Sequence, residues 1–189
     1  DLAKLKAEVK HEHHEEEGSG FRERIFRDID RFSALGSALA PISNAATKVP
    51  GARRVMDAVA GIAPERELPT FRAESFEEWF ASRGGSTVAP AEAVETVALF
   101  PDTYTNYSYP AAGKAAVRVL EAANVRVEVP DDLAPSGRAA FSTGFLDEAR
   151  DRAATNVDRL APRVRDGQSV VFVEPSDAVM FQDEYLDLL

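Results

Sequence analysis

Leu133-Ala-Pro-Ser-Gly-Arg138 is the stretch around which this chain is organised. It follows the strand-like run Val125–Val129, in which apolar and charged residues alternate, and it precedes a helical run from about Gly144 to Val164. A strand, a loop and a helix in that order form half of a parallel α/β unit. The loop is therefore expected at the carboxyl end of a strand, where such sheets gather their binding residues.

The neighbouring segments repeat this alternation. Val94–Phe100 is apolar without alternation, as expected of a buried parallel strand, and Ser169–Val173 is a third strand-like run. Helices are expected over Ala111–Asn124 and Ala178–Leu189. The inward face of the first of these helices is predicted from Ala115, Val119, Leu120 and Ala123. The alternation predicts a parallel sheet with right-handed crossovers, and one edge of it carries the loops 101–109, 130–142 and 174–177.

The first third of the chain has a helical pattern. Three helices are expected, over residues 1–17, 21–47 and 51–62, with Leu2, Leu5 and Val9 on the apolar side of the first. Pro41 is expected to end or kink the second helix. Arginines flank the apolar residues of these helices, which suggests that the helices lie on a membrane surface or dock a partner protein. Packing on their own domain is favoured, because aspartates interrupt the basic face.

A connector separates the two regions. Ser75, with Glu78 three residues later, is a capping box that predicts a short helix pinned to the core by Trp79 and Phe80. The polar segment Arg83–Pro90 is interpreted as a flexible linker. The sequence thus predicts an α/β protein in two parts, a helical segment with its connector over residues 1–88 and a small parallel-sheet α/β half-domain over residues 89–189.

Composition narrows the function classes. The chain has 189 residues and a formal charge of −10, which argues against a nucleic-acid partner, because phosphate binding needs a basic patch. Lysine supplies 5 of the 22 basic residues, a pattern typical of a salt-adapted protein or of a GC-rich genome. The chain has no cysteine, which excludes disulfides, thiolate metal sites and a cysteine nucleophile. We expect a cytoplasmic piece of a longer polypeptide, with contact at the inner face of the membrane as an alternative.

Two smaller groups of residues have a binding chemistry. His11 and His14 lie one helical turn apart with Glu15 beside them, which suits a zinc or nickel ion, although a solvated helix end is the favoured interpretation. Tyr104, Tyr107 and Tyr109 form an aromatic group in the first strand-end loop. They suit a ligand or a partner's cofactor, but packing on their own domain is favoured.

The strand-end loops carry a resemblance. Leu99-Phe-Pro-Asp-Thr103, Pro135-Ser-Gly-Arg138, Ser142–Ala149 and Glu174-Pro-Ser-Asp177 resemble the motifs of the cysteine-rich half-domain of iron–sulfur oxidoreductases, known for its Cys-Cys-Gly motif. There are 31 residues between Thr103 and Pro135, 37 between Ser136 and Glu174, and two between Glu174 and Asp177, which is similar to the family's ligand spacing. That half-domain occurs in heterodisulfide reductase subunits, in the iron–sulfur subunit of anaerobic glycerol-3-phosphate dehydrogenase, and in glycolate oxidase and D-lactate dehydrogenase.

The N-terminal region resembles one branch of the same family, the large FAD-linked oxidases of the D-lactate dehydrogenase type. In that branch a helix like residues 1–17 follows a ferredoxin-type domain, and Phe100–Asn106 also fits this branch best. The resemblance implies a parent with an FAD-binding domain and a ferredoxin domain with 4Fe-4S clusters upstream. It implies oxidation of a small 2-hydroxy acid, such as D-lactate or glycolate, with electron transfer to a respiratory-chain acceptor.

The departures from the family decide what this chain does. By the resemblance, Thr103, Pro135, Ser136, Glu174 and Asp177 stand at ligand positions, yet none of them offers the sulfur that clusters require. We therefore expect no cofactor and no catalysis in this part, which is interpreted as a scaffold or docking domain of the oxidoreductase. Two alternatives stay open. One is a free-standing interaction module, and the other is an oxygen-ligand site for Mg²⁺ or a similar ion at Ser136, Glu174 and Asp177.

Overall fold

A three-stranded parallel sheet stands at the centre of the C-terminal part. The computed structural model describes residues 2–46, 49, 51–63, 65–66 and 69–189. Strand β1 (Glu95–Phe100) lies between β2 (Val125–Glu128) and β3 (Ser169–Phe172), so the strand order is β2-β1-β3. Both pairings are parallel, with Val97 beside Val127 on one side and beside Ser169 on the other. The predicted α/β class and all three predicted strands are confirmed.

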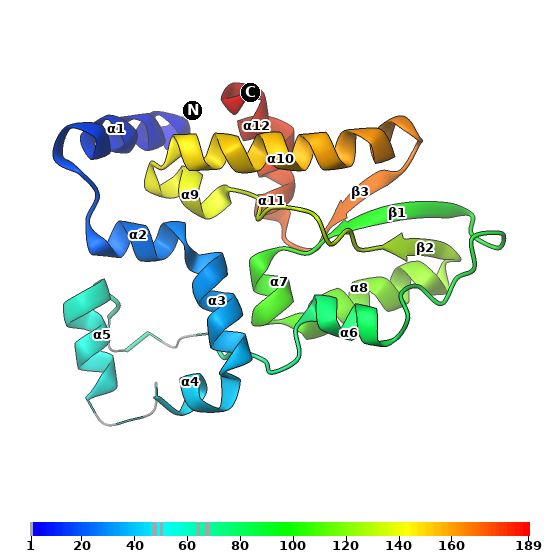
Figure 1. Ribbon diagram of the computed structural model, residues 1–189, viewed down its shortest axis with the longest axis horizontal. Coiled ribbons are helices and arrows are strands. Elements are labelled where there is room, and N and C mark those ends of the chain that lie inside the picture. The colour runs from blue at the N-terminus through cyan, green and yellow to red at the C-terminus, as the bar shows by residue number, and fades with distance from the viewer. Residues whose placement is uncertain (1, 47–48, 50, 64, 67–68) are drawn as a thin grey trace.

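Helices cover both faces of this sheet (Figure 1). Helices α6 (Phe76–Ser82) and α8 (Pro110–Ala122) lie on one face, and α10 (Leu146–Arg165) with α11 (Pro175–Val179) lies on the other. Every residue of β1 from Val97 to Phe100 is buried, because its side chains alternate between these two covered faces. One core cluster, on the α6 and α8 side, contains Phe76, Phe80, Val97, Leu99, Val117 and Val127.

The inward face of α8 differs from its prediction. Val119 is 69% exposed and Ala115 and Ala123 are also exposed, whereas Gly113 and Val117 are buried and Leu120 packs against the core. The reason is the close approach of α6. A Cβ on Gly113 would lie 2.6 Å from the Phe76 ring, so the helix turns its glycine toward that ring.

Three predicted loops or helices have more structure than the sequence pattern indicates. The loop after β1 contains α7 (Thr103–Tyr107), and the loop after β2 ends in α9 (Arg138–Thr143), which starts at Gly137 with a φ of 85°. The last helix begins earlier than predicted, as α11, continues through a π-helical turn at Met180–Glu184 and ends as α12 (Tyr185–Leu188). Both short helices start from local backbone and capping geometry, which the apolar periodicity does not register.

The N-terminal part consists of short helices. They are α1 (Leu2–Glu17), α2 (Phe21–Arg27), α3 (Ile29–Ala38), α4 (Ala40–Ala46) and α5 (Ala52–Ala60), and α3 to α5 extend away from the sheet in Figure 1. The predicted helix 21–47 is thus interrupted at Asp28 and Leu39, while Pro41 lies in the first turn of α4, where proline is tolerated. Residues 1 and 47, at the ends of two predicted helices, lie outside the described residues. None of the helices in the described ranges combines the length and the apolar character that crossing a membrane requires.

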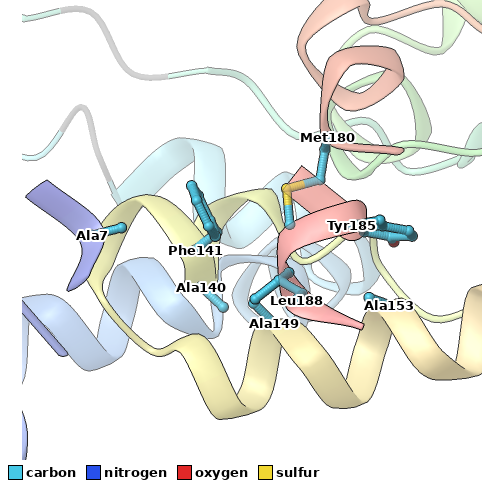
Figure 2. Close-up of a cluster of buried hydrophobic side chains, with 8 residues drawn as sticks. All are labelled: Ala7, Ala140, Phe141, Ala149, Ala153, Met180, Tyr185 and Leu188. Atoms are coloured by element: carbon cyan, nitrogen blue, oxygen red, sulfur yellow. The ribbon is translucent and has the colours of Figure 1, made fainter. Parts of the chain in front are cut away.

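Helix α1 packs through a small residue rather than through its predicted apolar stripe. Leu2, Leu5 and Val9 are 80%, 55% and 56% exposed, whereas Ala7 is buried. Ala7 belongs to a second core cluster together with residues of α9, α10 and the C-terminal helix (Figure 2). The members drawn there are Ala7, Ala140, Phe141, Ala149, Ala153, Met180, Tyr185 and Leu188. A close helix contact selects alanine, because larger side chains would hold the helices apart.

The connector is anchored to the sheet domain. Ser75 and Glu78 form the predicted capping box, and Phe80 is buried in the core, with Trp79 packed against it. The segment expected to be a flexible linker is held by the Glu121 carboxylate, which accepts hydrogen bonds from Arg83 at 2.9 Å and from the Thr87 N–H at 2.7 Å. Helix α6 thus shares a core with β1, and the boundary at residue 88 stays a prediction.

Candidate functional site

The carboxyl edge of the sheet brings two of the predicted ligand positions together. Ser136 follows β2 and Asp177 lies in α11 after β3, and the Ser136 hydroxyl donates a hydrogen bond to Asp177 Oδ1. Both residues are buried, with 9% and 8% of their surface exposed. The prediction that these loops meet at one edge is confirmed for this pair.

A buried polar network fixes the backbone of the loop. The Ala134 N–H donates to Asn156 Oδ1 at 2.9 Å, and the Asn156 amide donates to Tyr185 Oη at 3.0 Å. Tyr185 Oη in turn donates to the Ser136 carbonyl at 2.8 Å. Burial raises the pKa of Tyr185, so the phenol stays protonated and is a dependable donor. The loop is therefore held in place by hydrogen bonds from the protein itself.

Sequence reasoning missed Asn156 and Tyr185. Asn156 is fully buried and lies on the same face of α10 as Ala149, Ala153 and Leu160. A lone asparagine on an apolar helical face is a signal that a polar group elsewhere needs a partner. Tyr185 has no comparable local signal, because its partners lie 29 and 49 residues away in sequence.

Three carboxyl groups interact electrostatically at this edge. The pKa of Asp177 is raised to about 6. Burial is the largest cause and the charges of Asp102 and Glu174 contribute, while the Ser136 hydrogen bond and Arg138 act in the opposite direction. Burial is also the largest cause that raises the pKa of Asp102, with a contribution from Glu174. Asp102 Oδ1 caps α7 by accepting from the Thr105 N–H at 2.8 Å. In the described part of the chain, Asp102 Oδ2 is buried without a hydrogen-bond partner.

Glu174 has a local task. Its Oε1 accepts from the Ser176 N–H at 3.0 Å and from the Ser176 hydroxyl at 2.8 Å, so Glu174 caps α11. Asp177, the acid that the sequence places nearest the expected helix start, lies inside the first turn and points its carboxylate at Ser136.

The remaining predicted ligand positions line a shallow hollow. Thr103 and Pro135 border a cavity of about 230 Å³ together with Asn106, Tyr107 and Asp30 from α3. The three tyrosines do not form one group. Tyr104 and Tyr109 stack at 4.7 Å and are about half exposed, while Tyr107 faces this hollow.

The residues present do not fit an iron–sulfur cluster. Thiolates hold such clusters, and this chain has no cysteine. Proline offers no side-chain donor, and the Ser136 hydroxyl already donates a hydrogen bond to Asp177 Oδ1. Within the described ranges, Asp102, Glu174 and Asp177 do not place three carboxylate oxygens within 4.8 Å of one another. The oxygen-ligand site at Ser136, Glu174 and Asp177 stays a prediction.

The chain is thus an α/β protein in which Asp102, Ser136 and Asp177 lie at the carboxyl edge of a parallel sheet. Its sequence is similar to one of the subunits of anaerobic glycerol-3-phosphate dehydrogenase from Escherichia coli (strain K12), with 28% identity over 169 residues. The same protein from Escherichia coli O157:H7 gives the same 28% identity over 169 residues. The match covers 89% of this chain and 42% of the relative.

The chain thus spans about two fifths of the length of the curated relatives it matches. No protein-family model matches the chain, and no solved structure matches it. The likeness relates this chain to a subunit of a dehydrogenase, in agreement with the broad part of the predicted resemblance.

Proposed function

We propose that this chain is a cluster-free scaffold and docking domain of a flavin- and iron–sulfur-dependent oxidoreductase. The observation that carries the proposal is the 28% identity to a dehydrogenase subunit over 89% of the chain. In the proposal, FAD and 4Fe-4S clusters belong to upstream domains or partner subunits. The substrate of the parent is a small 2-hydroxy acid, such as D-lactate or glycolate, and electrons pass to a respiratory acceptor.

The hydrogen bonds at the strand-end edge support a scaffold role. In a cluster-binding loop, bonds from iron to the cysteines hold the backbone in place. Here Asn156, Tyr185 and Asp177 hold Ala134–Ser136 through hydrogen bonds. The loop therefore keeps a defined geometry without a metal, which is what a domain needs if it retains a surface after losing its redox centre.

The surface of the N-terminal helices supports a docking role. Large apolar side chains are exposed along α3 to α5, which lie apart from the sheet (Figure 1). They are Phe32, Leu35, Leu39, Ile42, Val55 and Val59, each at least 46% exposed. A cluster of exposed apolar side chains is typical of an interaction surface. In the proposal this surface contacts the flavin or ferredoxin domain.

The native protein tests the proposal. An antibody raised against this chain is used to isolate the protein from the source cells, and its size, flavin fluorescence and iron content are measured. The isolated protein is then assayed for dye reduction with D-lactate, glycolate and glycerol 3-phosphate. We expect flavin, iron and activity with a 2-hydroxy acid to accompany the chain.

A band near 20.6 kDa without flavin or iron would instead support the free-standing interaction module. Activity with glycerol 3-phosphate alone would retain the oxidoreductase and reject the 2-hydroxy acid.

The ligand positions have a separate test. A variant with cysteine at positions 103, 135, 136, 174 and 177 is reconstituted anaerobically with iron and sulfide. If the resemblance assigns these positions correctly, the variant gains a cluster, seen by its visible absorbance. The wild-type chain, which has no cysteine, is the matched control. Equal iron retention by both proteins would contradict the assignment.

A further inference from the structure

Three ligand-type side chains from distant parts of the sequence meet away from the strand-end edge. His11 and Glu15 lie on α1, and Asp147 lies in the first turn of α10. Their ligand atoms all lie within 4.8 Å of one another, and His11 Nε2 is 3.8 Å from Glu15 Oε1. Among the residues that the structure describes, no other three histidine or acidic side chains bring their ligand atoms this close together.

The helix contact that creates the group is specific. A Cβ on Gly144 would lie 2.5 Å from Lys10 Cβ and 3.0 Å from the backbone nitrogen of His11. Position 144, between α9 and α10, must therefore be glycine for α1 to come this close. The Lys10 ammonium also donates to the Ser142 carbonyl at 2.9 Å. These contacts place the face of α1 that carries His11 against the start of α10.

The tautomer of the neutral His11 ring follows from its backbone partner. His11 Nδ1 lies 3.2 Å from the Gly144 carbonyl oxygen, which can only accept a hydrogen bond. Nδ1 must therefore carry the proton, which leaves the lone pair of a neutral ring on Nε2, the atom that faces Glu15. Metal-binding histidines in proteins are oriented in this way, by donating their other ring N–H to a carbonyl or a carboxylate.

We propose that His11, Glu15 and Asp147 form a zinc-binding site that ties α1 to the start of α10. One imidazole nitrogen and two carboxylate oxygens are three protein ligands of the types zinc takes, and water supplies the fourth position. The two carboxylates also balance the charge of a divalent cation. Arg150 Nη1 donates a hydrogen bond to Asp147 Oδ1 at 2.8 Å, which orients the Asp147 carboxylate.

The site differs from the one predicted from the sequence, which paired His11 with His14. The His14 ring instead packs against Phe145, with ring centroids 4.7 Å apart, and is not part of the group. Asp147 takes its place as the third ligand. The role of the ion is mechanical, because it joins two segments that lie more than 130 residues apart in the sequence.

Calorimetric titration of the 189-residue chain with zinc chloride tests the site. We expect one zinc per chain, and at least tenfold weaker binding for Glu15→Gln and for Asp147→Asn. Both side chains are well exposed, at 68% and 73%, so these changes leave the fold intact. Magnesium chloride should bind far more weakly than zinc, because an imidazole ligand favours the softer ion.

His13→Ala is the matched control. His13 and Glu17 form a second pair four residues apart on α1, with 3.9 Å between Nδ1 and Oε2. Among the described residues, no third histidine or acidic side chain completes a metal-binding group with this pair. This variant should bind zinc as the wild type does. Wild-type affinity in Asp147→Asn would overturn the proposal, since the pair on α1 would then suffice. Equal weakening in His13→Ala and Glu15→Gln would also overturn it, since binding would then be general to the histidine-rich helix.

Amide hydrogen exchange gives a second readout. If zinc bridges the helices, it should slow exchange in α1 in the wild type and have no effect in Asp147→Asn. Equal slowing in both proteins would contradict a bridge to α10.

Discussion

Replacing Asp177 with asparagine should stabilise the protein at neutral pH. The carboxyl group is buried at the strand-end edge beside Asp102 and Glu174, and its pKa is raised from the ordinary value of 3.8 to about 6. An acid with a raised pKa in the folded protein binds its proton more tightly there than in the unfolded chain. Its stabilising contribution is therefore present below pH 3.8 and is lost as the pH rises toward 6.

The size of the effect follows from the two pKa values. They differ by about 2, and each unit corresponds to about 1.4 kcal/mol, so ionised Asp177 costs the folded protein about 3 kcal/mol. Asparagine has nearly the same shape, remains neutral, and still accepts the hydrogen bond from the Ser136 hydroxyl. The free-energy advantage of Asp177→Asn should therefore grow by about 3 kcal/mol between pH 3.8 and 6 and then stay constant.

Urea denaturation at a series of pH values measures this difference. Trp79, the single tryptophan, packs against the core of the sheet domain and reports unfolding by its fluorescence. Asp158→Asn, at an exposed position on α10, is the matched control, and its difference from the wild type should stay within about 0.5 kcal/mol. The reasoning is refuted if the advantage of Asp177→Asn does not change between pH 4 and 7, whatever its absolute size.

Other changes probe the packing and the polar network. Phe76→Ala, at a fully buried ring, should lower the free energy of unfolding by about 3–5 kcal/mol in the same urea assay. Gly144→Ala should release α1, seen as faster proteolysis of that helix, whereas Gly167→Ala, at a similar φ of 89° with nothing within 4 Å, should not. Tyr185→Phe leaves the Ser136 carbonyl without its phenol donor and should cost about 1–3 kcal/mol, and an unchanged urea midpoint would contradict the network.

The strands are the part of the fold that the sequence predicts best. Val97–Phe100 is apolar because both faces of β1 are covered, and such a run is visible without any knowledge of its partners. The capping box of Ser75 and Glu78 is equally local and is confirmed. Patterns of this kind depend on neighbouring residues alone.

Helix faces are harder to predict, because a partner decides them. The apolar residues of α8 suggest an inward face through Val119, yet the Phe76 ring selects the face of Gly113. In α1, Lys10 and His11 lie against Gly144, and Ala7 is buried while the larger Leu5 stays exposed. Neither glycine contact is visible in hydrophobic periodicity.

The strand-end edge is predictable in outline. The meeting of Ser136 with Asp177 follows from the rule for parallel sheets, and the structure confirms it. Asn156 and Tyr185 reach this loop from two other helices. No sequence pattern near either residue predicts that arrangement. The same holds for Asp147, which joins His11 and Glu15 across the chain.

The contacts of α1 have a consequence for synthesis on the ribosome. One of its partners, Gly144, lies 133 residues after His11, and another, Leu188, follows later still. At about 5–20 residues per second, α1 waits on the order of 10 s for them after it leaves the exit tunnel. During that interval Ala7, the buried residue of α1, has nothing from α9 or α10 to pack against. The glutamates and lysines of α1 help to keep the helix soluble until those partners have been synthesised.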